Sequence, residues 1–250
     1  MPPFHWWRTV FVLIPLIAVY TIVLGLASLV GGLLDRRGMW AHRCAQWWGR
    51  AIVRTSGVRI ERRGSLPPPD RSCIFVANHA SIYDIPILFT AIPRQLRIMA
   101  KAALGWVPFI GWHLKWSGHL LVNRTNPGAG ILKKMQRLTR HGASLIVFPE
   151  GSRTRDGRVQ PFKAGVFLLA VENRWPIVPV TLTGSRTVMP KGRLMVCPAD
   201  VVVTVHEPIS TDGLTRRDVR ALAERVREIV AGAGPGTSDA AGVPEATNRV

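Results

Sequence analysis

The chain has 250 residues, and its 33 Lys and Arg against 15 Asp and Glu give a formal net charge of +18. This excess of positive charge indicates an anionic partner, either a nucleic acid or an anionic membrane surface. A hydrophobic content of 47% with nine Trp favours the membrane. The three cysteines are widely separated, which excludes a disulfide framework and a zinc-type spacing and fits a reducing compartment.

Residues 9–34 form an apolar run without a formal charge. As a helix rising about 1.5 Å per residue, the run can cross a hydrocarbon core of roughly 30 Å. It is too long for a signal peptide, and no small-residue cleavage site follows it. Tryptophans stand on both sides of the run, as in an interfacial belt: Trp6, Trp7, Trp40, Trp47 and Trp48. Residues 1–54 are therefore expected to form a membrane anchor.

The orientation of this anchor follows from the positions of its charges. Five Arg and one Asp lie within residues 35–54, whereas Arg8 alone precedes the apolar run. The positive-inside rule then keeps the rest of the chain on the cytoplasmic side of the cell inner membrane. Pro15 and Gly31-Gly32 leave a second geometry open, in which the run bends and lies in one leaflet beside an interfacial helix over residues 39–54.

After the stiff turn "GSLPPPD" at residues 64–70, short apolar runs alternate with mixed segments. The apolar runs predict strands at residues 73–77, 120–122, 144–148, 177–182 and 201–205. The mixed segments predict helices at residues 84–91, 130–141, 163–172 and 216–231. This order indicates an α/β domain over residues 55–231, with a largely parallel, mixed sheet flanked by helices and preceded by the membrane-embedded helix. Residues 232–250 are rich in Gly, Ala and Pro and predict a disordered tail.

Polar clusters follow three of the predicted strands, at the edge of a parallel sheet where functional groups gather. In the first, "NHASIYD", His79 can meet Asp84 only if the chain folds back near Ser81, because five residues on one helix do not share a face. A carboxylate bound to Nδ1 would leave Nε2 of His79 free to act as a base. In the alternative, Ser81 and Asp84 form a capping box at the start of the next helix.

The other two clusters favour a catalytic role for His79 and Asp84 over a capping box. Arg124 and Arg153 each follow a predicted strand and are suited to binding a phosphate, and Glu150 lies in the loop of Arg153, which it could orient. The sequence contains neither a G-x-S-x-G nucleophile nor a Walker-type loop. The base would therefore activate a substrate hydroxyl directly, for attack on an electrophile that is already activated.

Four blocks resemble those of the glycerolipid acyltransferases, the family of 1-acylglycerol-3-phosphate acyltransferases. The N-H-x4-D signature is found at residues 78–84, and the second block, a Gly with an Arg six residues later, at 118–124. The third block is "FPEGSR" at residues 148–153, where Ser152 stands in place of the common Thr, and "VPV" at 178–180 matches the fourth. The resemblance spans roughly residues 70 to 185 in the order of the family.

The resemblance implies an enzyme that moves a fatty acyl group from acyl-CoA or an acylated acyl carrier protein to the hydroxyl of lysophosphatidic acid, producing phosphatidic acid at a phospholipid membrane. His79 would remove the hydroxyl proton and Asp84 would orient His79. Arg124 and Arg153 would hold the substrate phosphate, with Lys101 as a further candidate cation. Glu150 and Gly151 would shape the loop of the third block, in which Ser152 is a further substrate-binding residue. Neither a metal nor a bound cofactor is expected, since the thioester is a co-substrate.

Three other functions compete with this one. Another acceptor, such as glycerol 3-phosphate or a lysophospholipid, fits the same motifs. A membrane-tethered nucleic-acid binder would fit the charge, but the basic residues are scattered and many flank the apolar run, so no nucleic-acid partner is expected. A metal-dependent hydrolase using His79, Asp84 and Glu150 lacks a familiar ligand spacing.

Overall fold

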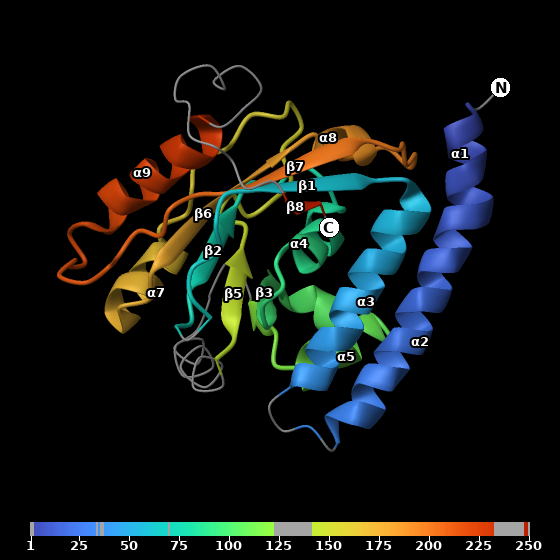
Figure 1. The fold of residues 1–250 in the computed structure, drawn as a ribbon, viewed down its shortest axis with the longest axis horizontal. Helices are drawn as coiled ribbons and strands as arrows, with labels where there is room; N and C mark the ends of the chain where they lie inside the picture. Colours follow the sequence, from blue (N-terminus) through green and yellow to red (C-terminus); the bar gives the residue numbers. More distant parts are fainter. Residues whose placement is uncertain are drawn as a thin grey trace.

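The computed structural model describes residues 3–33, 35, 38–69, 71–122, 142–232 and 248–249. The described chain is built around one twisted sheet with helices on both faces and a long helix along one side (Figure 1). The strands are β1 (Arg59–Arg63), β2 (Ile74–Ala77), β3 (Leu96–Lys101), β4 (Leu120–Val122), β5 (Ser144–Val147), β6 (Ile177–Thr183), β7 (Asp200–Val205) and β8 (Asn248–Arg249).

The strand order is β4-β3-β5-β2-β6-β7-β1-β8. The first five strands in this order are parallel to one another. β7 runs antiparallel to β6, β1 runs parallel to β7, and β8 runs antiparallel to β1. The expected α/β fold with a largely parallel, mixed sheet is thus confirmed.

Helices cover both faces of this sheet. The described helices are α1 (Phe4–Arg8), η1 (Thr9–Leu13), α2 (Ile14–Gly32), α3 (Met39–Ser56), α4 (Asp84–Ala91), η2 (Ala102–Trp106), α5 (Ile110–Trp116), α7 (Gly165–Asn173), α8 (Ser185–Val188) and α9 (Val219–Gly232). Figure 1 shows α3 and α4 on one face and α7 with α9 on the other. The side chains of β2 alternate accordingly, since Phe75 and Ala77 pack into the core beneath α3 and α4, and Ile74 and Val76 into the core beneath α7 and α9.

The N-terminal helix runs without a break from Phe4 to Gly32. Its turns widen over η1, directly before Pro15, whose ring cannot donate a backbone hydrogen bond and would clash with a carbonyl one turn earlier. By length and composition it is the one helix in the described ranges that could cross a membrane, with 29 residues and 11% of its most apolar window buried. It packs against α3 and α5 instead of projecting from the domain.

Helix α3 joins this N-terminal helix to the rest of the domain. Its buried side chains, among them Ile52 and Val53, belong to the same core as Phe75 of β2. Gly49 allows the close crossing of α3 over α4, because a Cβ at this position would come within 2.9 Å of the Pro86 carbonyl oxygen. The anchor boundary expected after residue 54 falls inside α3, which ends at Ser56.

The remaining predictions can be compared element by element. The helix expected at residues 84–91 has those bounds in the structure, and the expected strands lie within one residue of the observed ends. β1, β3 and α5 were not expected, because charged side chains interrupt the apolar pattern in each of them. The helix expected at residues 130–141 and nearly all of the expected tail lie outside the described residues.

A cluster of buried histidines joins α3, β3 and α5. β4 begins opposite Met99, so the N–H groups earlier in β3 lack a strand partner on that side. The Leu96 N–H donates instead to Nδ1 of His42 at 3.3 Å, and the Ile98 N–H donates to Nδ1 of His119 at 2.9 Å. Both rings must keep these nitrogens unprotonated, and the buried guanidinium of Arg97 lies among them.

Burial, reinforced by the charge of Arg97, lowers the pKa of His42 to about 4 and the pKa of His119 well below its ordinary value. The pKa of His113, whose Nδ1 lies 2.6 Å from the Ser28 hydroxyl, is lowered to about 4 for the same reasons. The unfolded chain therefore binds more protons than the folded chain between about pH 4 and pH 6.5. These three rings therefore make their full contribution to the free energy of unfolding above pH 6.5. That contribution decreases as the pH falls from 6.5 towards 4.

We predict that His119→Asn weakens this loss of stability in acid. The amide oxygen of Asn can accept the Ile98 N–H in place of Nδ1, and it does not titrate. Denaturant unfolding of the detergent-solubilised protein at pH 7 and pH 5 should give a smaller difference in unfolding free energy for the variant than for the parent chain. An unchanged difference would show that the His119 ring takes no part in the acid response.

Candidate functional site

The candidate site lies at the carboxyl ends of β2 and β5, which are neighbours in the sheet. β2 ends at Ala77 and leads directly into Asn78 and His79, and β5 ends at Val147 and leads into the loop that carries Glu150. Asn78 holds the first loop in place because its side-chain amide bonds the backbone N–H and carbonyl of Leu182 in β6, at 2.8 and 3.0 Å. These residues therefore meet at the carboxyl ends of the parallel strands, where the sequence predicts that functional groups gather.

His79 and Asp84 are in direct contact. Nδ1 of His79 lies 2.7 Å from Oδ2 of Asp84, and the side chain of Asp84 has no exposed surface while that of His79 is 15% exposed. The same Oδ2 accepts the N–H groups of Ala80 and Ser81 at 2.8 and 2.9 Å. Three donors on one carboxylate oxygen fix the imidazole with Nε2 turned away from the acid, and no hydrogen bond of Nε2 is found within the described ranges.

The local chain path explains how residues five apart can meet. Residues 81–83 form a turn, and α4 begins at Asp84 itself, with Tyr83 in the capping position and no side-chain cap. The helix thus begins later than in the alternative with Ser81 as its N-cap, although one bond of that capping box, from the Ser81 N–H to Oδ2 of Asp84, is present beside the contact with His79. The hydroxyl of Ser81 donates instead to the carbonyl of Met189 at 2.9 Å and accepts the N–H of Tyr83 at 3.2 Å.

The imidazole is also held by an aromatic ring. Phe148 stacks on His79 with 4.2 Å between the ring centroids and 21° between the planes. Such stacking restricts the rotation of the ring about its side-chain bonds and keeps water from that face. Phe148 belongs to the third sequence block, so this block contributes to the position of the base as well as to the binding loop.

Glu150 clamps the two loops together. Its Oε1 accepts the backbone N–H of His79 at 2.6 Å and its Oε2 accepts the N–H of Gln160 at 3.1 Å. Burial raises the pKa of this carboxyl, while the two N–H donors oppose the shift. This differs from the expectation that Glu150 orients Arg153: the oxygens bind backbone groups, and no bond to Arg153 is present among the residues that the structure describes.

The two carboxylates occupy three consecutive amides of the first block. The N–H groups of His79, Ala80 and Ser81 all donate to Glu150 or Asp84. The sequence suggested a backbone N–H near this block as the group that stabilises an oxyanion, and these three amides are not available for that role. A donor for an oxyanion would have to be a group other than these three amides.

Arg153 and Gly151 lie in the loop after β5, beside the histidine. The N–H of Thr154 donates to the carbonyl of His79 at 2.8 Å, which places Arg153 at the mouth of the site with its side chain half-buried. Gly151 has a φ of +77°, and a Cβ there would meet Nζ of Lys163 at 2.9 Å. Ser152 is exposed. The loop that bonds to His79 thus carries the cationic Arg153 and lies against the side chain of Lys163.

Of the two other expected binding residues, Lys101 lies along the same edge of the sheet. Lys101 is the last residue of β3, is exposed, and pairs with Val122 of β4. Arg124 follows two residues after Val122 but lies outside the described residues. No group of three or more His, Cys, Asp and Glu side chains within the described ranges is arranged to hold a metal ion.

The N-terminal helix is connected to the site through α3. The guanidinium of Arg8 donates to the carbonyls of Ser56 and Val196 at 3.3 and 3.1 Å. The hydroxyl of Ser56 lies 2.8 Å from the hydroxyl of Tyr83, the residue before Asp84. Ser56 and Tyr83 therefore connect Arg8, at the beginning of the helix, to the residue next to Asp84. The sequence offered no signal for this connection.

Comparison with known proteins agrees with this geometry. The family model described as Acyltransferase matches residues 53–183, more than half of the chain. A chloroplastic 1-acyl-sn-glycerol-3-phosphate acyltransferase, BAT2, from Brassica napus is 35% identical over 182 residues, covering 71% of this chain and 53% of the relative. The human 1-acyl-sn-glycerol-3-phosphate acyltransferase alpha is 34% identical over 175 residues, covering 68% of this chain and 62% of the relative.

The fold is likewise similar to that of a solved structure. The crystal structure of the 1-acyl-sn-glycerophosphate acyltransferase PlsC from Thermotoga maritima superposes with a TM-score of 0.71 at 26% sequence identity, covering 86% of this chain and 92% of that chain. This chain spans only about half to three-fifths of the length of the curated relatives named above. The resemblance seen in the four sequence blocks is confirmed, and the chain belongs to the acyltransferase family.

Proposed function

We propose that this chain transfers a fatty acyl group from a thioester, either acyl-CoA or an acylated acyl carrier protein, to the free sn-2 hydroxyl of 1-acyl-sn-glycerol 3-phosphate, giving phosphatidic acid. The observation that carries this proposal is the His79–Asp84 contact of 2.7 Å, in a loop flanked by cationic side chains. The relatives named as acyltransferases of this lysophospholipid support the choice of acceptor.

The reaction follows from the orientation of His79. Nε2 takes the proton of the acceptor hydroxyl as its oxygen attacks the thioester carbonyl, and Asp84 stabilises the imidazolium that forms. Collapse of the tetrahedral intermediate forms the ester and expels the thiolate, which takes the proton back from the imidazolium. General-base assistance of this kind typically contributes about 10²–10⁴ in rate.

The acceptor phosphate is assigned to the half-buried Arg153, with Lys101 and Arg124 as further cations. A guanidinium can bind two phosphate oxygens at once, and its partly buried position strengthens the attraction relative to bulk water. Glu150 and Gly151 shape the loop that carries Arg153, and Ser152 is a further polar neighbour. The function needs neither a metal ion nor a bound cofactor.

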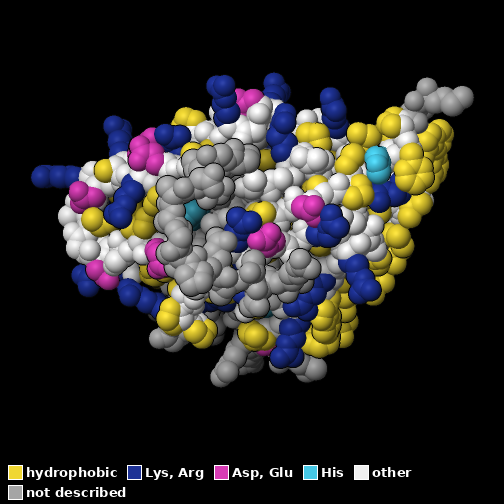
Figure 2. All heavy atoms as spheres, turned by 45° about the horizontal axis from the view of Figure 1, so that its top comes forward, with side chains coloured by type: hydrophobic (Ala, Val, Ile, Leu, Met, Phe, Trp, Pro, Cys, Tyr) yellow, Lys and Arg dark blue, Asp and Glu magenta, His cyan; other side chains and the backbone are white. Residues whose placement is uncertain are grey.

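We place this activity at a membrane surface, with the N-terminal helix lying in one leaflet. Figure 2 shows hydrophobic side chains gathered along the edge formed by α1 and α2, while Lys and Arg are spread over the rest of that face. The packing of α2 against α3 and α5 supports this geometry over a span that leaves the domain. The Arg-rich segment after the helix supports the cytoplasmic face of the cell inner membrane.

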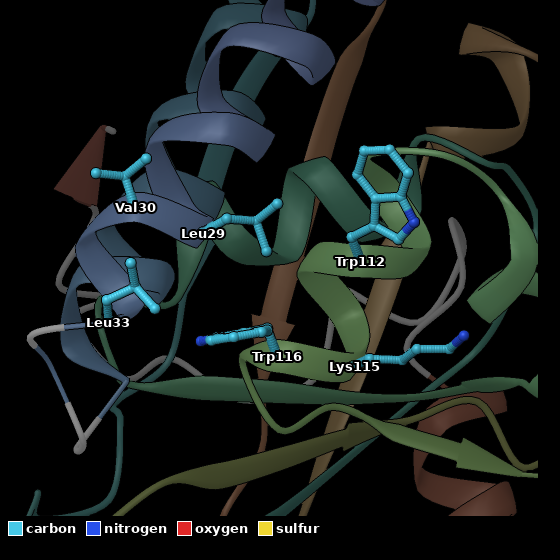
Figure 3. A pocket seen from close by; sticks show the side chains of 6 residues that line it. All are labelled: Leu29, Val30, Leu33, Trp112, Lys115 and Trp116. Atoms are coloured by element: carbon cyan, nitrogen blue, oxygen red, sulfur yellow. The ribbon is translucent and has the colours of Figure 1, made fainter.

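An apolar groove at the end of the same edge supports this placement. It has a volume of about 440 Å³, and Figure 3 shows that α2 and α5 provide its lining: Leu29, Val30, Leu33, Trp112, Lys115 and Trp116. The ammonium of Lys115 lies 4.6 Å from the centroid of the exposed Trp106 ring. Exposed Trp beside Lys is typical of a bilayer interface.

A second acceptor class remains compatible with this geometry. The loop after β5 recognises a phosphate, which glycerol 3-phosphate and lysophospholipids also carry. The apolar edge formed by α1 and α2 favours an acceptor that already carries an acyl chain and resides in the membrane. This observation favours lysophosphatidic acid over the water-soluble glycerol 3-phosphate as the acceptor.

The direct test gives the purified protein a set of acceptors with one labelled acyl thioester. We expect phosphatidic acid as the main product, with glycerol 3-phosphate and neutral monoacylglycerol poorly used. His79→Ala and Asp84→Asn should reduce the rate by about a hundredfold or more, because the first removes the base and the second removes the charge that stabilises the imidazolium. Near-normal turnover by folded His79→Ala protein would eliminate this mechanism.

A second prediction concerns the phosphate. Arg153→Gln should raise the KM for lysophosphatidic acid by about tenfold or more, because a charge-assisted hydrogen bond contributes roughly 1.5–3 kcal/mol. The residual use of monoacylglycerol, which has no phosphate, should not change. Arg220→Gln, on the exposed side of α9, is the control. A uniform loss of kcat with every acceptor would contradict the assignment of Arg153.

A third prediction concerns the clamp. Glu150→Gln replaces one acceptor oxygen by an NH₂ group, so one of the N–H groups of His79 and Gln160 loses its partner. The unfolding free energy should fall by about 1–3 kcal/mol, and kcat should fall while the KM for lysophosphatidic acid changes little. Glu172→Gln, which affects only an exposed ion pair with Arg216, should alter neither quantity. Equal behaviour of the two variants would show that Glu150 does not position His79.

A further inference from the structure

Two segments that border the catalytic pair carry an excess of positive charge. Residues 151–163 and 185–193 together contain seven Lys and Arg, against one acid, Asp156. The basic residues are Arg153, Arg155, Arg158, Lys163, Arg186, Lys191 and Arg193. The acceptor brings one phosphate, which needs only a part of this charge. The remaining positive charge would attract a second anionic group close to the site.

Both segments touch the loop of the base. The Thr154 N–H donates to the carbonyl of His79 at 2.8 Å, and the hydroxyl of Ser81 donates to the carbonyl of Met189 at 2.9 Å. The segments are also bonded to each other, because the guanidinium of Arg186 donates to the carbonyl of Arg155 at 2.9 Å. Their cations are therefore held around the mouth of the site instead of being scattered over the surface.

These cations lie at two depths. Arg153 and Lys191 are half-buried, and Nζ of Lys191 donates to the carbonyl of Arg153 at 3.0 Å. Arg155, Arg158 and Arg186 are exposed. We call Arg155, Arg158 and Arg186 the outer cations.

The outer cations form no ion pair with the one nearby acid within the described ranges. One oxygen of the Asp156 carboxylate accepts the hydroxyl of Thr154 at 2.7 Å and the backbone N–H of Arg158 at 3.0 Å. No ion pair of Arg155, Arg158 or Arg186 is found among the residues that the structure describes. Their guanidinium groups can therefore bind an anion from solution without first breaking an ion pair with the protein.

The N-terminal helix meets the domain at a different part of this rim. Thr9, at the start of η1, accepts the N–H of Val196 at 2.9 Å, and Arg8 donates to the carbonyl of the same residue. A membrane-resident acceptor would approach along this helix. The outer cations lie on the loop after β5 and on α8, and a water-soluble substrate can reach them from the aqueous side.

We propose that the outer cations Arg155, Arg158 and Arg186 bind the phosphate-bearing carrier of the acyl donor. This inference rests on the proposed function, because it assigns the second substrate of the same site. The shared chemistry is the phosphate ester on the pantetheine arm, which both coenzyme A and acyl carrier protein possess. Coenzyme A adds further phosphates, and acyl carrier protein adds an acidic surface. Holding the carrier at this rim leaves its thioester free to extend towards Nε2 of His79.

The test uses the full chain with Arg155→Gln and Arg186→Gln combined. The control combines Arg220→Gln and Arg225→Gln, which remove the same charge from the exposed side of α9. Three donors carry the same acyl group: acyl-CoA, acylated acyl carrier protein, and S-acyl-N-acetylcysteamine, which has no phosphate. Titration calorimetry with coenzyme A and with acyl carrier protein measures binding independently of turnover.

We expect the double variant to raise the KM for a phosphate-bearing donor, and the corresponding Kd, by about fivefold to tenfold, as expected for two partly solvated charge contacts. The KM values for S-acyl-N-acetylcysteamine and for lysophosphatidic acid should stay unchanged, and the control should match the parent. An effect on coenzyme A alone or on acyl carrier protein alone identifies the carrier.

Equal effects on all three donors, a raised KM for lysophosphatidic acid only, or unchanged binding of both carriers would overturn the assignment. The proposed function is tested separately by the same material. If the parent chain binds a carrier through these arginines but transfers no acyl group to lysophosphatidic acid, the donor site stands and the proposed acceptor does not.

Discussion

The structure of the site depends on one buried carboxylate. Asp84 has no exposed surface, and removing such a charge from water costs several kcal/mol unless donors replace the lost hydration. The donors are Nδ1 of His79 and two consecutive backbone N–H groups, and all of them converge on one oxygen. The chain can bring them together only by turning over residues 81–83, so the electrostatic requirement of the acid dictates the path of the loop. The position of the base follows from that path.

Glu150 extends the same principle to the neighbouring strand. Its oxygens bind one N–H in the β2 loop and one in the β5 loop, so two segments 71 residues apart are joined without a side-chain partner of opposite charge. Together with the stacking of Phe148, this fixes the imidazole in three directions. The cost is that every amide of residues 79–81 is already occupied. In the proposed reaction, a developing oxyanion would therefore have to be stabilised by other groups.

The sequence predicted some of these features and not others, for identifiable reasons. The contact between His79 and Asp84 was predicted because the polar clusters after the neighbouring strands favoured a catalytic pair over a capping box, and helix geometry required the chain to fold back for it. The role of Glu150 was not, since its partners are backbone N–H groups, which every residue except proline has. β3 was missed because Arg97 and Lys101 interrupt its apolar pattern, although Arg97 is 3% exposed. Its guanidinium donates to the carbonyls of Leu96 and Gly38 at 2.9 and 3.2 Å, and the second of these is a long-range contact that no local pattern reveals.

The link between the N-terminal helix and the base has a consequence for how the enzyme works. Arg8 binds the carbonyl of Ser56, and the hydroxyl of Ser56 binds Tyr83, which precedes the acid. A helix that lies in one leaflet would therefore fix the depth of the base relative to the bilayer through contacts with little freedom to slide. Such a fixed depth would suit the proposed acceptor, whose hydroxyl sits at a constant level below its phosphate. A soluble donor needs no such constraint, because its flexible arm can adjust to the position of the base.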